Sequence, residues 1–309
     1  MIHETLNLKE MKILLVDDTS SNIDVLMKTL EPEGYSLAVA SSGKKALEIA
    51  QRFLPDLILL DIVMPRFDGF ETCRQLKKKE ATQDIPVIFI TARNDPDDII
   101  KGFDAGGVDY ISKPFRQEEV CVRVRTHLKL RNLMKRLEYL ARTDQLTGLS
   151  NRRDILTKIE QEIFRYQRNK RTFILIMCDI DHFKTINDTY GHDTGDCILI
   201  NVAQALKEAV RNYDTVGRWG GEEFLIVLPE TELADGIQVA EKLRLNVESK
   251  EFYYNEKKLK ITISFGVSIY EDGMTIDTCI KRADERLYIA KETGRNKIIP
   301  ATNISVRPL

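Results

Sequence analysis

The chain has 309 residues, with 46 lysines and arginines against 48 aspartates and glutamates and a formal net charge of −2. This length predicts two domains, and the near-neutral charge without a long basic run argues against a nucleic-acid-binding arm or a membrane-binding patch. We therefore expect no nucleic-acid partner. The cysteines are scattered, no apolar stretch reaches the length of a bilayer, and the N-terminus lacks a signal-peptide core. These features predict a cytoplasmic protein with no membrane span.

In the first third of the chain, short apolar runs alternate with amphipathic stretches. This alternation predicts a doubly wound α/β domain with a parallel sheet. Open sheets of this kind bind their ligands at the carboxyl ends of their strands. Five polar residues fall at those predicted ends: Asp17, Asp18, Asp61, Thr91 and Lys113.

The three aspartates at this predicted edge suggest a metal site. Carboxylates gathered at one edge repel one another unless a divalent cation binds between them, and ligands that are all oxygen favour Mg2+ or Mn2+. A carboxylate beside such a cation can attack a phosphoryl group, while the Lys113 ammonium and the Thr91 hydroxyl can hold the transferred oxygens. Asp61 is the candidate acceptor.

Residues 116–147 contain neither proline nor glycine and predict one long connecting helix. Leu130, Leu133, Leu137 and Leu140 recur at intervals of three, four and three, as in the seam of a short coiled coil. A helix packed only on its own domain is the alternative, because two heptads are few for a coiled coil. We expect an N-terminal domain over 11–129, the connecting coiled-coil helix over 130–147 and a C-terminal domain over 148–305.

The C-terminal region follows a different order of elements. After Arg152 we expect a helix, a strand over 173–181, a second helix, a hairpin built on Gly220 and Gly221, a helix over 234–247, a strand over 261–269 and a last helix from near Ile276. This mixed order predicts a ferredoxin-like or palm α+β domain with helices on one face of the sheet.

A second acidic cluster is predicted in this domain. Asp179 and Asp181 end the first strand on the same face, and Glu222 lies at the hairpin tip, where two glycines can take positive φ angles and let a phosphate approach. Asp179 and Glu222 could hold one or two Mg2+ ions that bridge nucleotide phosphates and lower the pKa of an attacking hydroxyl. The chemistry alone predicts nucleotidyl transfer or hydrolysis, although two glycines before two glutamates also form ordinary turns.

Four motifs in the N-terminal domain resemble the receiver domain of two-component response regulators: VDD (16–18), LLDIVMP (59–65), FITA (89–92) and DYISKPF (109–115). The resemblance implies that Asp17 and Asp18 bind the metal and that a cognate histidine kinase phosphorylates Asp61. It also implies a backbone metal ligand at Val63, a switch pair of Thr91 and Tyr110, and a phosphate-binding lysine at Lys113. A pseudo-receiver that is not phosphorylated is the alternative, although all the required side chains are present.

Five motifs in the C-terminal domain resemble the GGDEF family of diguanylate cyclases: DQLTGLSNRR (144–153), DIDHFKTINDTYGHDTGD (179–196), GRWGGEEF (217–224), SFGVS (264–268) and ADERLYIAKETGRNK (283–297). The resemblance implies a homodimer in which each domain binds one GTP. Each 3′-hydroxyl then attacks the partner's α-phosphate, so that two GTP yield cyclic di-GMP and two pyrophosphates. Glu222 stands at the third position of the signature, where active members carry Asp or Glu.

The same resemblance implies residue roles. Asp179 and the carbonyl of Ile180 bind the metal, and Glu222 is both a metal ligand and the general base. An amide at Asn187 and a carboxylate at Asp196 suit the donor and acceptor edge of guanine. The resemblance further implies that the phosphates are bound by Lys184, Lys291 and Arg295, and that His192 helps to form the nucleotide pocket.

A short motif upstream of the signature resembles the product-binding inhibitory site of this family. Arg211 offers a planar fork of donors for a phosphate or a guanine edge, and Asp214 can accept from guanine. A third contact, often an arginine in the following helix, here falls on Lys242, which cannot bind in a bidentate way and leaves the strength of inhibition open.

Two alternatives to a phosphorylation-regulated cyclase with product feedback inhibition differ in class. One is a catalytically silent GGDEF domain that senses GTP or cyclic di-GMP, against which the intact Asp179, Glu222, Asn187 and Asp196 argue. The other is a DNA-binding response regulator, which requires a helix-turn-helix that the sequence does not supply.

Overall fold

The computed structural model describes residues 11–64, 68–92, 96–114, 116–254 and 257–301. Pro65 and Phe115, which end two of the receiver-like motifs, and the last residues of the expected C-terminal domain lie outside these ranges. The chain divides into two compact units, 1–137 and 138–309. Within the described ranges, no helix is both long and apolar enough to cross a membrane.

The N-terminal unit is built on a five-stranded sheet with the order β2-β1-β3-β4-β5, and every neighbouring pair is parallel. This order belongs to the doubly wound folds and confirms the expected parallel sheet. β3 and β4 are buried at every position because helices cover both faces. The strands are β1 Lys12–Val16, β2 Ser36–Ala40, β3 Leu57–Asp61, β4 Val87–Thr91 and β5 Asp109–Ser112.

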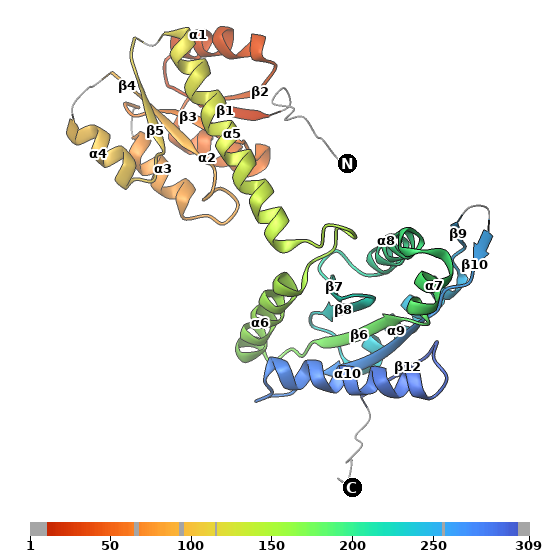
Figure 1. The fold of residues 1–309 in the computed structure, drawn as a ribbon. Coiled ribbons are helices and arrows are strands. Elements are labelled where there is room, and N and C mark those ends of the chain that lie inside the picture. Colours follow the sequence, from red (N-terminus) through yellow and green to blue (C-terminus); the bar gives the residue numbers. More distant parts are fainter. Residues whose placement is uncertain (1–10, 65–67, 93–95, 115, 255–256, 302–309) are drawn as a thin grey trace. The chain divides into compact units, whose positions relative to one another are not determined.

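Alternate residues of these strands enter two apolar cores. α1 and α5 cover one face, where Leu26 and Val124 pack with Ile13 and Leu59, and α2 and α3 cover the other (Figure 1). The helical elements are α1 Ser20–Leu30, the short 3-10 helix Glu31–Glu33, α2 Gly43–Phe53, α3 Gly69–Lys77, α4 Pro96–Asp104 and α5 Gln117–Arg142.

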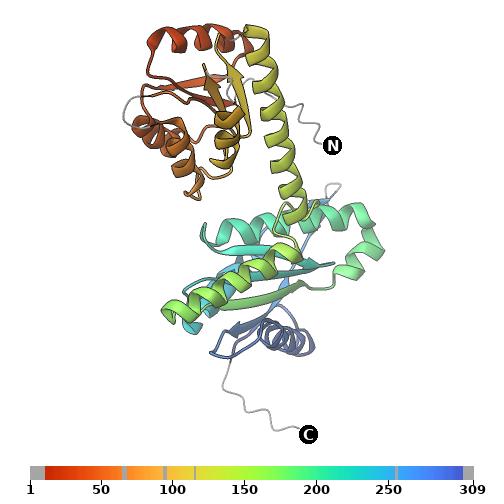
Figure 2. The same ribbon diagram turned by 90° about the vertical axis from the view of Figure 1, so that its left-hand side faces the viewer.

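α5 is one unbroken helix, as Figure 2 shows, but it ends at Arg142 and not near Thr147 as expected. The chain turns there because the Asp144 N–H donates to the Leu149 carbonyl at 2.8 Å and Asn151 donates to the Arg142 carbonyl at 2.8 Å. The leucines of the predicted seam are between 45% and 66% exposed.

The C-terminal unit holds a mixed sheet with the order β12-β11-β6-β8-β7, in which the pair β12–β11 is parallel and the pairs β11–β6, β6–β8 and β8–β7 are antiparallel. These four strands, with α8 and α9 between them in sequence, form the expected ferredoxin-like arrangement. The further elements are α6 Arg152–Asn169, β6 Ile174–Ile180, α7 Phe183–Tyr190, α8 His192–Ala209, β7 Thr215–Gly220, β8 Glu223–Leu228, α9 Leu233–Ser249, β9 Phe252–Tyr254, β10 Lys257–Leu259, β11 Ile263–Ile269, α10 Ile276–Glu292 and β12 Ile298–Ile299.

The expectation that helices cover only one face of this sheet is wrong. α8 and α9 pack on the face that carries Ile176 and Cys178, while α6 and α10 pack on the opposite face with Leu175 and Met177. β6 is therefore buried at all seven positions. The apolar stripes of α6 and α10 predict burial but do not say which face of the sheet they cover.

Candidate functional sites

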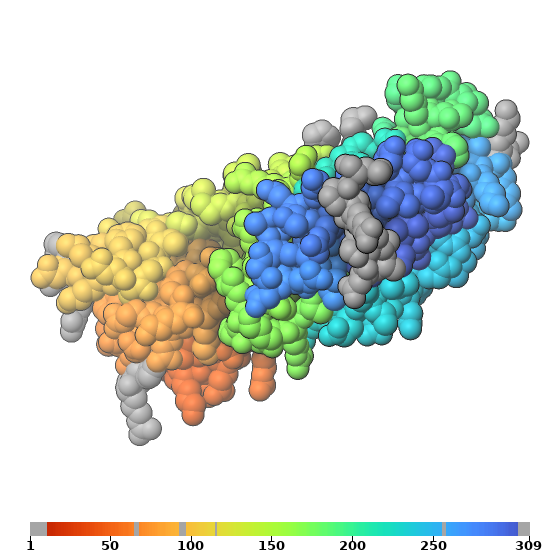
Figure 3. Space-filling view, turned by 90° about the horizontal axis from the view of Figure 1, so that it is seen from below, coloured from red at the N-terminus to blue at the C-terminus, as the bar shows by residue number. Residues whose placement is uncertain are grey.

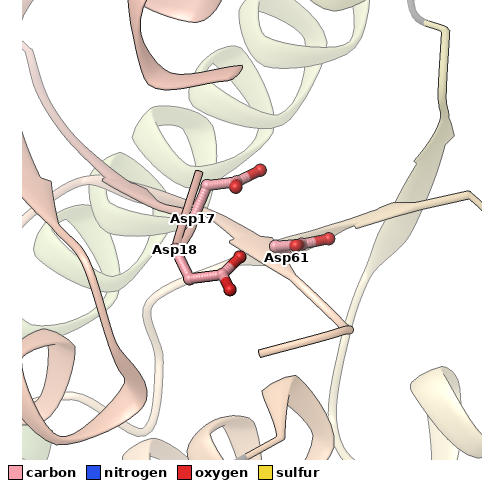
Figure 4. Close-up of side chains that lie close together, drawn as sticks. All are labelled: Asp17, Asp18 and Asp61. Atoms are coloured by element: carbon pink, nitrogen blue, oxygen red, sulfur yellow. The ribbon is translucent and has the colours of Figure 1, made fainter. Parts of the chain in front are cut away.

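The receiver-like unit gathers three carboxylates at the carboxyl edge of its sheet. Asp17 and Asp18 follow β1, Asp61 ends β3, and Figure 4 shows their side chains on the same side of the strand ends. A carboxylate oxygen of each lies within 4.8 Å of the other two. Asp17 and Asp61 are almost fully buried, whereas Asp18 is exposed. This donor set fits a hard divalent cation.

Lys113 neutralises part of this cluster. Its Nζ lies 2.8 Å from Asp17 Oδ2 and 3.1 Å from Asp61 Oδ1. Asp17 also accepts from the Thr19 N–H at 2.9 Å and from Asn22 Nδ2 at 3.0 Å, so its orientation is set by several donors. Burial and the neighbouring Asp17 charge raise the pKa of Asp61 against the opposing effect of Lys113.

The remaining receiver residues surround this edge. Thr91 is buried at the end of β4, and its carbonyl accepts from the Lys113 N–H at 2.6 Å. Tyr110 lies on the neighbouring β5, with the Arg123 guanidinium 5.8 Å from its ring centroid. Val63 is 56% exposed, and its predicted metal ligand is the backbone carbonyl because a valine side chain has no ligand atom.

In the C-terminal unit, Asp179 on β6 meets the tip of the β7–β8 hairpin. β6 pairs antiparallel with β8, which places Asp179 opposite Glu223, and the Ile180 N–H donates to the Glu222 carbonyl at 3.4 Å. Gly221 has a φ of +33°, a conformation that favours glycine at this turn. The predicted metal residues Asp179, Ile180 and Glu222 therefore adjoin at one end of the sheet.

The electrostatics of Asp179 mark it as an unusual carboxylate. Burial, with smaller contributions from the nearby Glu222 and Glu223, raises the pKa of Asp179 to about 6 against the opposing effect of Lys291. Lys291 Nζ lies 2.8 Å from Asp179 Oδ2. The lysine that the sequence predicts as a phosphate contact thus reaches the predicted metal ligand.

Glu223 is a candidate that the sequence reasoning missed. It starts β8 directly opposite Asp179, and burial together with Asp284 and Glu222 raises its pKa against the effect of Lys291. The signal was present in the hairpin register, because the residue that follows a tight turn must pair with the neighbouring strand.

Asp181, the second carboxylate of the predicted pair, has a different environment. It accepts from Thr262 Oγ1 and Ser264 Oγ, both at 2.7 Å, and from the Asn296 N–H at 3.0 Å. Its buried carboxylate holds the loop after α10, where Arg295 has a φ of +59°. Asp181 therefore supports the segment that carries Arg295.

The predicted guanine-binding residues lie on α7 and α8. The segment that holds α7 stands out from the face seen in Figure 3. The Asn187 Oδ1 atom is buried and has no hydrogen-bond partner among the described residues. A Cβ on Gly195 would lie 1.9 Å from that atom, so glycine is required for this approach. The other predicted contacts are exposed at Lys184, His192 and Asp196.

The Arg211–Asp214 turn between α8 and β7 forms a separate polar cluster. The Arg211 N–H donates to Asp214 Oδ2 at 2.8 Å and its guanidinium donates to Tyr213 Oη at 2.7 Å. Asp214 Oδ1 is buried without a partner in the described part of the chain, and burial raises the pKa of Asp214. Lys242 donates to the Ala209 carbonyl at 2.7 Å, close to this turn in sequence.

Two family models match the chain. The one described as "Diguanylate cyclase, GGDEF domain" covers residues 141–297, about half of the chain, and the one described as "Response regulator receiver domain" covers 13–125. Both resemblances seen in the sequence motifs are thereby confirmed.

Two curated relatives are similar to the chain over different lengths. Response regulator PleD of Caulobacter vibrioides is 35% identical over 301 residues, covering 93% of this chain and 65% of PleD. Diguanylate cyclase A of Treponema denticola is 40% identical over 165 residues, covering 52% of this chain and 44% of that protein. The chain spans less than two thirds of either relative.

A solved structure supports the fold of the second unit. The coiled coil and GGDEF domain of DgcB from Caulobacter crescentus, in complex with c-di-GMP, is 28% identical with a TM-score of 0.57. The likeness covers 60% of this chain and 98% of that one.

Proposed function

Because the chain belongs to the GGDEF family of diguanylate cyclases and carries a response regulator receiver domain, we propose that it condenses two GTP into cyclic di-GMP and two pyrophosphates under the control of phosphorylation. The observation that carries the proposal is the meeting of buried Asp179 with the acidic tip of the β7–β8 hairpin at one end of the sheet.

The residues of this site suit nucleotidyl transfer. Asp179, the Ile180 carbonyl and Glu222 would hold a divalent cation, which neutralises negative charge on the triphosphate when bound. Glu222 takes the proton from the attacking 3′-hydroxyl as its oxygen bonds to the α-phosphorus, and pyrophosphate leaves. The remaining roles are the reading of guanine by Asn187 and Asp196, phosphate contacts from Lys184, Lys291 and Arg295, and a pocket wall at His192.

The unpartnered Asn187 oxygen supports the guanine role. A buried acceptor without a donor costs about 1–3 kcal/mol, and an amino group of a bound base would satisfy it. Binding of the nucleotide would thereby remove the free-energy cost of the unpaired Asn187 oxygen in the free domain.

One domain holds only one of the two reacting nucleotides, so the proposed activity requires two chains. The exposed leucines at 130, 133, 137 and 140 on α5 offer an apolar stripe for a homodimer. Phosphorylation of Asp61 by a cognate histidine kinase would then control how the two chains pair. The cluster of Asp17, Asp18 and Asp61 with Lys113 supports this acceptor role.

Product feedback belongs to the same proposal. Arg211 and Asp214 would bind cyclic di-GMP, with the unpartnered Asp214 Oδ1 accepting from guanine. Lys242 already donates to the Ala209 carbonyl, and its single ammonium makes a weaker third contact than an arginine fork.

The test is to incubate the purified chain with GTP and Mg2+ and to measure pyrophosphate and cyclic di-GMP. We expect two pyrophosphates to be released for each cyclic di-GMP formed. The rate per chain should rise with protein concentration, because two chains must pair. Glu222→Ala should fold and make neither. A wild-type chain that binds GTP but releases no product even with beryllofluoride, which takes the place of the phosphoryl group on Asp61, would contradict the proposal and favour the silent sensor.

A further inference from the structure

Arg218, on β7, joins the catalytic hairpin tip to the turn that follows α5. Its Nε and Nη2 donate to the Gly221 carbonyl at 2.9 and 2.8 Å, and its Nη1 lies 3.2 and 3.3 Å from the two Asp144 carboxylate oxygens. One guanidinium therefore binds both segments through separate nitrogens. Its side chain is only 18% exposed.

The Asp144 end of this link is firmly held. Asp144 Oδ1 accepts from the Thr147 N–H at 2.9 Å and from Thr147 Oγ1 at 2.7 Å. Burial alone would raise the pKa of Asp144, but the bonds from Thr147 and the charge of Arg218 outweigh it and lower the pKa. The carboxylate is therefore ionised at neutral pH and suits a charge-assisted bond.

The same turn is tied to the end of α5. Asn151 Nδ2 donates to the Ala141 carbonyl at 2.8 Å, and the Asn151 N–H donates to the Arg142 carbonyl at 2.8 Å. The Arg218 N–H donates to the Ser150 carbonyl at 2.9 Å. Backbone and side chain of Arg218 thus contact one short segment directly after the helix.

The Gly221–Glu222 turn lies between the paired residues Gly220 and Glu223 at the tip of the hairpin. Gly221, which precedes Glu222, has no Cβ and permits many backbone conformations. The backbone bond from Ile180 to the Glu222 carbonyl is long, at 3.4 Å. The two shorter bonds from Arg218 to Gly221 are charge-assisted and therefore the stronger restraint on the tip.

We propose that Arg218 is a positioning residue that fixes Glu222 in the catalytic site by clamping Gly221 to the Asp144 turn at the end of α5. This inference rests on the proposed cyclase function for its effect on turnover. Arg218 touches neither substrate nor metal in this scheme. Through Arg218, the position of Glu222 depends on the Asp144 turn, which directly follows α5.

Arg218→Lys in the full chain is the sharpest variant. Lysine keeps the positive charge near Asp144 but lacks the planar fork that reaches Gly221 at the same time. We expect kcat to fall about 10- to 100-fold, as for a displaced catalytic group, while KM for GTP changes little. Arg171→Lys, which alters an exposed arginine paired with Glu230 in the same domain, is the matched control. A raised KM with unchanged kcat would overturn the proposal.

A second variant tests the link to the helix end. Asp144→Asn should lower kcat less than Arg218→Lys, because the Gly221 bonds remain. Combining both should add little to Arg218→Lys alone, since residues in one network are not additive. Full additivity of the two effects would show that the Asp144 contact does not act through Arg218.

Hydrogen exchange separates this proposal from the cyclase function. In the GTP-free chain, the amides of Glu222 and Glu223 should exchange about tenfold faster in Arg218→Lys, as expected for the loss of a charged hydrogen bond, and at the wild-type rate in Arg171→Lys. Unchanged exchange at the tip would overturn the clamp. A wild-type chain without turnover would refute the cyclase function while leaving this measurement valid.

Discussion

Both units place a buried aspartate on the middle strand of a five-stranded sheet beside a lysine. Asp61 ends β3 with Lys113 3.1 Å away, and Asp179 lies near the end of β6 with Lys291 2.8 Å away. Burial raises the pKa of both carboxyl groups. The two sites differ in how the other acidic groups reach that aspartate.

The difference follows from strand direction. In the parallel sheet, β1 and β3 end at the same edge, so their aspartates meet without any help from a turn. β8 is antiparallel to β6, so the hairpin tip and not a strand end reaches Asp179. Within the described ranges, three carboxylates close enough to share one ion occur only at Asp17, Asp18 and Asp61. The three carboxylates of the receiver are close together at the strand ends, whereas the acidic groups of the candidate catalytic site meet where the two-glycine turn reaches Asp179.

The largest expected effect comes from the catalytic side of this comparison. Asp179→Asn keeps the shape of the side chain and removes its charge, so that the proposed cation loses a ligand and Lys291 loses its ion pair. We expect kcat to fall by about 100- to 1,000-fold or more, as when a preorganised electrostatic group is removed. Initial rates of pyrophosphate release at saturating GTP measure it.

Asp272→Asn is the matched control for that variant, because Asp272 is an exposed carboxylate of the same domain paired with Lys170. It should turn over at the wild-type rate. Equal activity of Asp179→Asn and Asp272→Asn would show that Asp179 has no role in turnover and is not the counterpart of Asp61.

Asp61→Asn tests the receiver site. Asparagine fills the same volume but cannot accept a phosphoryl group, so the activity ratio with and without beryllofluoride should fall to unity. The mass of the chain in solution, measured under the same conditions, reports whether pairing of the two chains responds as well. A variant that stayed fully responsive would mean that the receiver regulates by another route.

Much of the fold could be predicted from the pattern of the sequence. The βα alternation of residues 12–114 led to the parallel sheet, and strand ends then placed Asp17, Asp61 and Lys113 at one edge. The face covered by α6 and α10 could not be predicted, because helical periodicity shows that a stripe is buried but not against which surface. The end of α5 at Arg142 depends on backbone bonds to Leu149 and Asn151 that no local propensity encodes.

The residues of the candidate catalytic site could be predicted where they lie in sequence motifs. Those that depend on contacts between distant segments could not. Glu222 stands out in the signature, while Glu223 needs the register with Asp179. The support that Asp181 gives to Asn296 spans 115 positions, and the link from Arg218 to Asp144 spans 74. Such pairs become visible only when the fold brings their segments together.

Arg211→Ala extends the comparison to a third acidic position, Asp214, which lies in a turn and not at a strand end. Loss of the arginine fork should raise the cyclic di-GMP concentration needed for half-inhibition about tenfold or more, given about 1–3 kcal/mol for a bidentate contact to guanine. Inhibition curves at fixed GTP measure the shift, with Arg171→Ala as the control. An unchanged curve would exclude this turn as the product site.

The smallest expected effect concerns Asp109 in the receiver. Its pKa is lowered, whereas the pKa of Asp61 is raised. Burial alone would raise the pKa of Asp109, but hydrogen bonds from His127, the Tyr110 N–H and Arg123 outweigh it and lower the pKa. A carboxyl group with a lowered folded pKa stabilises the fold above its unfolded pKa of about 3.9, and this contribution is lost as the pH falls through the folded value.

Asp109→Asn should therefore destabilise the receiver by up to about 1 kcal/mol at pH 7, the scale of a partly exposed ion pair, and by progressively less as the pH approaches and passes below 4. Native-state hydrogen exchange of the β4 amides reports the free energy of opening in this unit alone. Asp24→Asn, an exposed carboxylate on α1, is the control. A difference between Asp109→Asn and the wild type that stayed constant with pH would mean that the aspartate acts through packing and not through its charge.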